Sequence, residues 1–138
     1  MKLLLIEDEP ALSETIEKYF TDEGSICEVC SNVGTAVEKI SMYEYDCILL
    51  DIGLPDGDGF NVVDWLRQHR NLAQLPLVVY SGREITPEER RQLTLGPTHF
   101  LTKARVQPQQ LEALVLTMLR SSRQMEEATP VTTGARKP

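Results

Sequence analysis

Five polar side chains in this sequence stand directly after short apolar runs, and together they could handle a phosphoryl group. They are Glu7, Asp8, Asp51, Ser81 and Lys103. Carboxylates brought within a few Å of one another repel by roughly 4 kcal/mol per pair at an intermediate dielectric, and a divalent cation relieves that repulsion. Such oxygen ligands suit Mg2+, which proteins commonly hold by one or two carboxylates with water and phosphate oxygens. A lysine and a hydroxyl complete the components for phosphoryl transfer, in which one carboxylate could act as the nucleophile.

These side chains can meet only if the apolar runs before them are neighbouring parallel strands. The expected strands are Leu3–Ile6, Ser25–Cys30, Cys47–Leu50, Pro76–Tyr80 and Phe100–Leu101. Short continuous apolar runs are typical of strands buried on both faces of a parallel sheet. Ligands of such sheets bind beyond the carboxyl ends of the strands, at the point where strand order reverses, so the polar side chains are expected to gather there.

Helical periodicity separates each strand from the next. Helices are predicted from Pro10 to Gly24, around 33–40, from 60 to about 70, from Pro87 to near Gly96, and along 111–119. Thr86, Pro87 and Glu89 supply an N-cap, a first-turn proline and a capping box. Strand and helix alternating five times predict an α/β fold, a single doubly wound (βα)5 sandwich with right-handed crossovers.

The composition sets further bounds. The 138 residues suit one domain, expected at 1–120, and the polar segment 121–138 is expected to be a frayed helix end and a flexible tail or linker. A net charge of −7 disfavours direct nucleic-acid binding by this chain. No apolar stretch is long enough to span a membrane, and the first apolar run is too short for a secretory signal, so a cytoplasmic location is expected.

Two weaker motifs fit ordinary structural roles better than metal binding. Cys27 and Cys30 have C-x-x-C spacing, but no second pair completes a zinc site, and residues three apart on a strand point to opposite faces. Free buried thiols in a reducing compartment are the preferred interpretation. The segment 56–59 has a faint likeness to a calcium loop, yet it lacks the remaining ligands and is interpreted as a turn.

The strand ends and their surroundings resemble the receiver domains of two-component response regulators. The matching segments are 4–10 (LLIEDEP), 46–55 (DCILLDIGLP) with Gly57 and Gly59, 78–82 (VVYSG), and Gly96 with 100–103 (FLTK). They occur in the order and spacing of that family and cover about residues 1–120. The resemblance implies a flavodoxin-like, five-stranded parallel sheet with strand order 2-1-3-4-5.

The resemblance also implies a metal site and a phosphoacceptor. Asp51 would receive a phosphoryl group from a sensor histidine kinase or a histidine phosphotransfer protein. Asp8 and Asp51 would bind Mg2+ through their side chains, Gly53 through its backbone carbonyl, and Glu7 through a water molecule. The domain would catalyse only its own phosphotransfer and dephosphorylation, so it is expected to be a switch and not an enzyme with other substrates.

The remaining implied roles concern the switch. Ser81 and Lys103 would contact the phosphoryl group, and Phe100 would turn inward. The roughly −1.5 to −2 charges that phosphorylation adds would bias a protein-interaction surface around the fourth helix, fifth strand and fifth helix. A phosphorylation-dependent homodimer stays open, although the last helix lacks the charged pattern expected of winged-helix regulators that dimerise through this face. The sequence names no output domain or target.

Some features depart from the family pattern and keep alternatives open. Ala104 follows Lys103 where the family has a proline after a cis peptide bond, and a cis bond to another residue costs ~3 to 4 kcal/mol. A phosphorylation-independent pseudo-receiver is therefore the alternative function. An aspartate-nucleophile phosphatase would need a second aspartate where Gly53 stands. Gly53 also offers no side chain to shield a phosphoryl group from water.

Taken singly, each site residue also fits an ordinary structural role. Glu7 and Asp8 could cap the next helix, because acidic side chains favour a helix N-terminus. Ser81 alone would be a turn residue, Lys103 a surface lysine, and Phe100 a core residue. The functional interpretation depends on their joint occurrence at the strand ends.

Overall fold

The structure is a computed structural model that describes residues 1–54, 59–69, 72, 74–102, 107 and 109–117. Strands and helices alternate along the chain as the sequence predicts. The strands are β1 (Lys2–Ile6), β2 (Ile26–Cys30), β3 (Cys47–Asp51), β4 (Leu77–Ser81) and β5 (Thr98–Thr102). The helices are α1 (Pro10–Asp22), α2 (Val33–Met42), α3 (Gly59–Arg67), α4 (Pro87–Leu93) and a C-terminal helix over 109–117.

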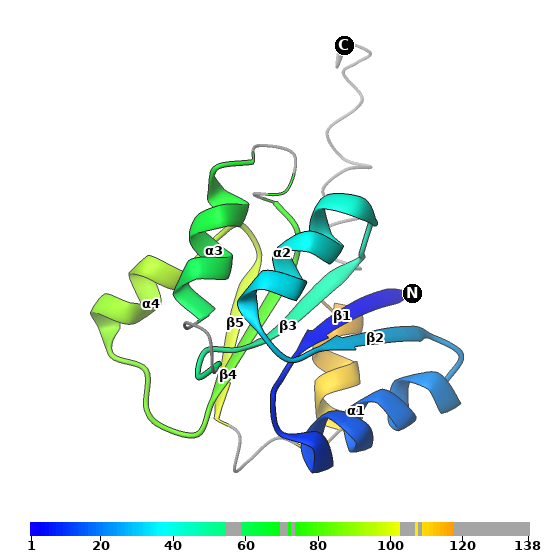
Figure 1. Ribbon diagram of the computed structural model, residues 1–138. Coiled ribbons are helices and arrows are strands. Elements are labelled where there is room, and N and C mark those ends of the chain that lie inside the picture. Colours follow the sequence, from blue (N-terminus) through cyan, green and yellow to red (C-terminus); the bar gives the residue numbers. More distant parts are fainter. Residues whose placement is uncertain (55–58, 70–71, 73, 103–106, 108, 118–138) are drawn as a thin grey trace, which may run out of the picture.

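The strands form one parallel sheet in the order β2-β1-β3-β4-β5. This confirms the predicted doubly wound α/β fold and its strand order. The chain moves from β1 outward to β2, then crosses back past β1 to β3, so the strand order reverses between β1 and β3 (Figure 1). A crevice beyond the carboxyl ends of these two strands is where such sheets bind ligands.

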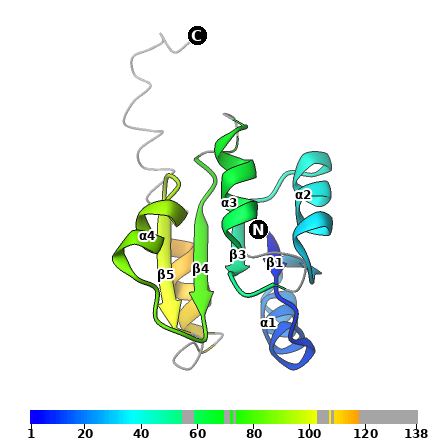
Figure 2. The same cartoon turned by 60° about the vertical axis from the view of Figure 1, so that its left-hand side comes forward.

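Two apolar layers hold the sheet between its helices. Alternate residues of β1 point to opposite layers: Leu4 and Ile6 pack with α2, α3 and α4, whereas Leu3 and Leu5 pack with α1 and the C-terminal helix. Figures 1 and 2 show α2 and α3 together on one side of the sheet and α1 on the other. Burial on both faces explains why the central strands read as continuous apolar runs.

The C-x-x-C pair is divided between these layers. Cys30 belongs to the layer under α2 and α3, and Cys27 to the layer under α1. Both thiols are free, and burial raises the pKa of Cys27 to about 12 and that of Cys30 to about 11. Side chains on opposite faces of a strand cannot share one metal ion, so the interpretation as buried free thiols is confirmed.

The helix ends match the sequence signals with two corrections. One is α3, which ends at Arg67 and not near 70. Thr86 and Glu89 form the predicted capping box of α4, and Gly24 takes a positive φ just after α1. Helix α4, however, ends at Leu93 and not near Gly96. Gly96, with φ of 53°, lies instead in a turn whose Leu95 N–H donates to Oγ1 of Thr98, 2.9 Å away. The glycine therefore lies in the turn that leads into β5.

Several sequence predictions concern positions that the structure leaves undescribed. The expected tail at 121–138 and the end of the last helix at 118–120 lie outside the described residues. Within the described part, Leu111 and Val115 of the C-terminal helix are buried as predicted. None of the helices in that part combines the length and apolar content needed to cross a membrane.

Candidate functional site

The ends of β1 and β3 bring three carboxylates together. Glu7, Asp8 and Asp51 each offer an oxygen atom, and these atoms lie within 4.8 Å of one another; we call these residues the acidic group. The register pairs Ile6 with Leu50, which sets the next residues of both strands side by side. Glu7 and Asp51 are 1% and 3% exposed, whereas Asp8 is exposed to solvent. Carboxylate oxygens gathered in this way are a set of ligands that suits a divalent cation such as Mg2+.

Backbone hydrogen bonds orient the two buried carboxylates. Oε2 of Glu7 accepts from the backbone N–H of Glu9 at 2.9 Å, and the Glu7 N–H donates to the carbonyl of Cys30. Oδ1 of Asp51 accepts from the N–H of Gly53 at 3.0 Å. The N-cap of α1 is Glu9, whose own side chain makes no capping bond. Because Glu7 accepts the N–H of this N-cap residue, its carboxylate also serves the start of α1.

A cavity of about 440 Å³ opens over Asp51. The described residues that line it are Asp8, Glu9, Asp51, Ile52, Gly53, Ser81, Gly82 and Arg83. A Cβ atom at position 53 would lie 3.8 Å from Oδ1 of Asp51, in ordinary van der Waals contact. A larger side chain at this position could therefore extend over the carboxylate, and the glycine leaves that side of the cavity uncovered.

Ser81 joins the acidic group from the next strand. It is the last residue of β4, is 2% exposed, and lines the same cavity as Asp51. Its Oγ accepts a hydrogen bond from the backbone N–H of Arg83 at 3.0 Å. The serine thus takes part in a turn after β4, and it also lies at the cavity where the predicted phosphoryl contact would occur.

Phe100 lies one strand further out, and Lys103 lies outside the described residues, as does Ala104. The ring of Phe100 is half-buried against the layer that contains α4. The guanidinium carbon of Arg90 stands 4.8 Å from the ring centroid, which is cation–π geometry. The structure therefore links Phe100 to α4 and gives no account of the lysine.

The sequence analysis missed two residues near the site. Tyr80 pairs with Asp51 in the sheet register, and burial, followed by the charge of Glu7 and more weakly that of Asp51, raises the pKa of Tyr80 well above its usual value. Its ring belongs to an apolar run, so the hydroxyl was overlooked. Arg83 lines the cavity, and its position two residues after Ser81 is the signal that could have revealed it.

The fold and the acidic group define a class of protein: a doubly wound α/β domain with oxygen ligands for a cation at its switch point. The family model described as the response regulator receiver domain matches residues 3–116 of this chain. The chain belongs to this family. It is thus a receiver domain of the two-component response regulator type, a class of generally non-enzymatic signalling domains that bind Mg2+ at an acidic site and interact with histidine kinases.

Named relatives agree with this assignment. The chain is 26% identical over 117 residues to the probable transcriptional regulator ycf29 of Porphyra purpurea, which is 85% of this chain and 56% of the relative. It is 31% identical over 103 residues to the cell cycle response regulator CtrA of Brucella ovis, which is 75% of this chain and 44% of the relative. The chain thus spans about half the length of these curated relatives.

Solved structures show the same fold. The receiver domain of the Francisella response regulator 1452 superposes with a TM-score of 0.76 at 24% identity, covering 88% of this chain and 98% of that chain. A CheY-like response regulator receiver domain from Methanospirillum hungatei gives a TM-score of 0.78 at 21% identity, covering 90% of this chain and 97% of that chain.

Proposed function

We propose that this receiver domain accepts a phosphoryl group on Asp51 in a Mg2+-dependent reaction. The observation that carries the proposal is the placement of Asp51: it is buried beside two other carboxylates and still lines a cavity. A nucleophile that works on an anionic substrate needs a bound cation nearby and access for the substrate, and this arrangement supports both.

The donor set fits Mg2+. All three members of the acidic group offer carboxylate oxygens, which are the ligands that this ion prefers. In the proposal, Asp8 and Asp51 bind by side chain, Gly53 by its backbone carbonyl, and Glu7 through a water molecule. The bound ion would neutralise charge on the phosphoryl oxygens during transfer.

The proposed reaction is a direct displacement at phosphorus. An oxygen of Asp51 forms a bond to the phosphorus of a phosphohistidine on the kinase or phosphotransfer protein. The phosphorus–nitrogen bond breaks, its electron pair stays on the imidazole, and that ring retains or takes up a proton. Ser81 and Lys103 would then hold the phosphoryl oxygens, and the protein would catalyse only this transfer and the later hydrolysis.

The proposed output is a change at the surface formed by α4, β5 and the C-terminal helix. The contact of Arg90 with Phe100 supports this choice, because it links the expected switch residue to α4. We further propose that the phosphorylated domain can form a homodimer through this surface. The proposed domain covers 1–120 and is followed by a flexible tail or linker. Direct nucleic-acid binding by this chain is not proposed. Free buried thiols are compatible with a cytoplasmic location.

Acetyl phosphate tests the proposal without a kinase. Intact mass is measured after incubation with and without Mg2+, for the wild-type chain and for Asp51→Asn. We expect one added phosphoryl mass that requires Mg2+ and is absent in the variant. Asp64→Asn, which changes an exposed aspartate on α3, is the matched control and should be phosphorylated normally. No added mass in the wild-type chain would favour the pseudo-receiver alternative, and the same mass in Asp51→Asn would mean that another residue is the acceptor.

A further inference from the structure

The loop after β4 ties the proposed phosphorylation site to α4 through one residue, Arg83. Its backbone N–H donates to Oγ of Ser81 at 3.0 Å, and the residue lines the cavity over Asp51. Its guanidinium makes a bidentate ion pair with Glu89, with nitrogen–oxygen distances of 2.9 and 3.0 Å. Arg83 therefore contacts the expected switch serine by its backbone and the fourth helix by its side chain.

Glu89 is the residue that organises the start of α4. Its Oε1 accepts the N–H of Thr86 at 3.0 Å, and its own N–H donates to Oγ1 of Thr86 at 3.1 Å. The hydrogen bonds from Arg83 and from the Thr86 backbone lower the pKa of Glu89 to about 2. The arginine and the helix cap thus share one carboxylate, so a change at Arg83 reaches the first turn of α4.

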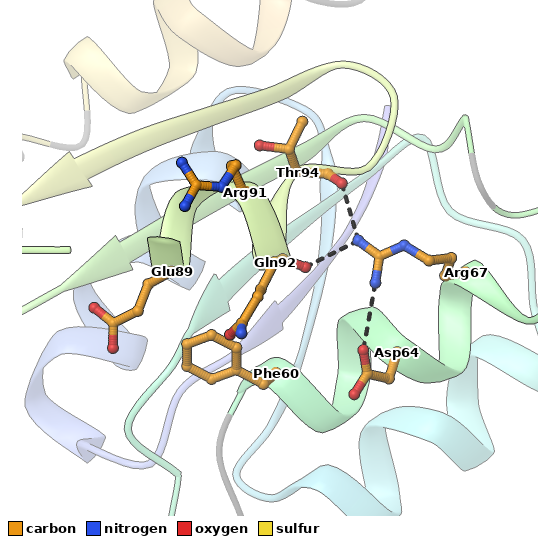
Figure 3. A pocket seen from close by; sticks show the side chains of 7 residues that line it. All are labelled: Phe60, Asp64, Arg67, Glu89, Arg91, Gln92 and Thr94. Atoms are coloured by element: carbon orange, nitrogen blue, oxygen red, sulfur yellow. Dashed lines mark hydrogen bonds and ion pairs between the residues drawn. The ribbon is translucent and has the colours of Figure 1, made fainter. Parts of the chain in front are cut away.

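The other end of α4 is fastened to a different element. Arg67 of α3 donates to the carbonyl oxygens of Gln92 at 2.9 Å and Thr94 at 3.0 Å, as Figure 3 shows. Leu93 beside them is completely buried. Because the carboxyl end of α4 is anchored to α3 and to the core, a release at Glu89 would free only the amino end.

The charges around Asp51 favour movement of the arginine toward a phosphoryl group. Among the described residues that line the cavity, Arg83 is the one with a positive charge, and Asp8, Glu9 and Asp51 are acidic. Arginine binds phosphate in the same bidentate geometry in which it binds a carboxylate. A phosphoryl group on Asp51 would therefore compete with Glu89 for the same guanidinium.

We propose that Arg83 is a switchable phosphoryl ligand, held by Glu89 in the unphosphorylated domain and exchanged to the phosphoryl oxygens when Asp51 is modified. The exchange removes the ion pair from the capping box and loosens the amino end of α4. Movement of Ser81 toward the phosphoryl group would assist it by releasing the Arg83 backbone. This inference rests on the proposed phosphorylation of Asp51.

Opposite effects of two single substitutions test the exchange. Glu89→Gln keeps an oxygen for the Thr86 N–H but releases the arginine, so phosphorylation by acetyl phosphate should be faster by roughly two- to fivefold, the range of an exposed ion pair. Arg83→Ala should be slower by roughly the same factor. The double variant should match Arg83→Ala, because Glu89 acts here only through Arg83. Arg91→Ala, which breaks the Glu88–Arg91 ion pair on the same helix, should leave the rate unchanged.

A structural role alone predicts a different pattern. If the ion pair only stabilises α4, both single variants break the same contact and shift the rate in the same direction, which would overturn the exchange. Amide hydrogen exchange gives a second readout: the first turn of α4 should exchange faster after phosphorylation in the wild-type chain but not in Arg83→Ala. Wild-type protein that gains the phosphoryl mass without a change at α4 refutes this inference alone. Wild-type protein that gains no mass refutes the proposed function and this inference together.

Discussion

Removing the charge of Asp51 should stabilise the domain when no divalent cation is present. At 4.8 Å, two unit charges repel by about 3.5 kcal/mol at an effective dielectric of about 20. That value applies to the buried pair Glu7 and Asp51, whereas the exposed Asp8 is screened and adds about 1 kcal/mol. The amide group of Asp51→Asn introduces a donor that costs about 1–3 kcal/mol if it finds no partner. Subtracting this cost from the combined repulsion of about 4.5 kcal/mol leaves an expected net gain in unfolding free energy of about 1.5–3.5 kcal/mol.

Urea unfolding at pH 7 in the presence of EDTA measures this gain. The variant should unfold at higher urea with an unchanged slope, since its native surface is the same. Asp22→Asn is the control, because it removes an exposed carboxylate at the end of α1 that pairs with Lys18. Its unfolding free energy should change by no more than about 0.5 kcal/mol.

Magnesium should offset most or all of this difference in stability. A ligand that binds only the native state at one hundred times its dissociation constant stabilises that state by about 2.7 kcal/mol. The wild-type chain should gain this stabilisation when Mg2+ is added. Asp51→Asn should gain little, because it lacks one of the carboxylates that would bind the ion. If Asp51→Asn is instead less stable than the wild type in EDTA, then the hydrogen bond from Gly53 outweighs the repulsion. The electrostatic argument for a cation would then be refuted.

Three further results follow from the same structure. Gly59→Ala would place a Cβ atom 2.8 Å from Cα of Ile52, so the unfolding free energy measured in urea should fall by about 1–3 kcal/mol. An unchanged urea midpoint would contradict the close contact. The Cys27 thiol, whose pKa burial raises to about 12, stays protonated below that pH and should not react with a thiol reagent at pH 8 until urea unfolds the chain. Gly53→Leu should prolong the phosphorylated state severalfold by excluding water, measured as slower loss of phosphoryl mass, and an equal or shorter lifetime would contradict the shielding argument.

The sheet was predictable because strands that are buried on both faces appear in the sequence as continuous apolar runs. Residues 47–50 form an apolar run that stops at a carboxylate, and in the structure Asp51 is the last residue of β3. Strand β1 follows the same rule, with Glu7 directly after Ile6. The topology then brings the strand ends together without further information. Residue types at strand ends were therefore sufficient to anticipate the acidic group.

Contacts between loops and helices were not predictable in this way. The pairing of Arg83 with Glu89 spans six residues across a loop and depends on side-chain conformation. Tyr80 was hidden because its ring satisfies the apolar pattern while its hydroxyl does not contribute to it. Gly96 was assigned to the end of a helix because a glycine with positive φ suits both a helix end and a turn. Local patterns cannot choose between such alternatives when tertiary contacts decide them.

The parts of the domain that could be predicted from the sequence are also the parts with the most buried contacts, whereas the contacts of α4 that could not be predicted belong to a part with few. The acidic group stands at the ends of β1 and β3, whose apolar residues are buried on both faces, so the core can hold carboxylates together against their repulsion. Helix α4 has seven residues, buries Leu93 alone, and is fastened at its two ends by the arginines Arg83 and Arg67. Elements with few buried contacts open at low free-energy cost. A charge added at the rigid strand ends would therefore displace α4 before it disturbed the sheet, which is the mechanical requirement for a switch.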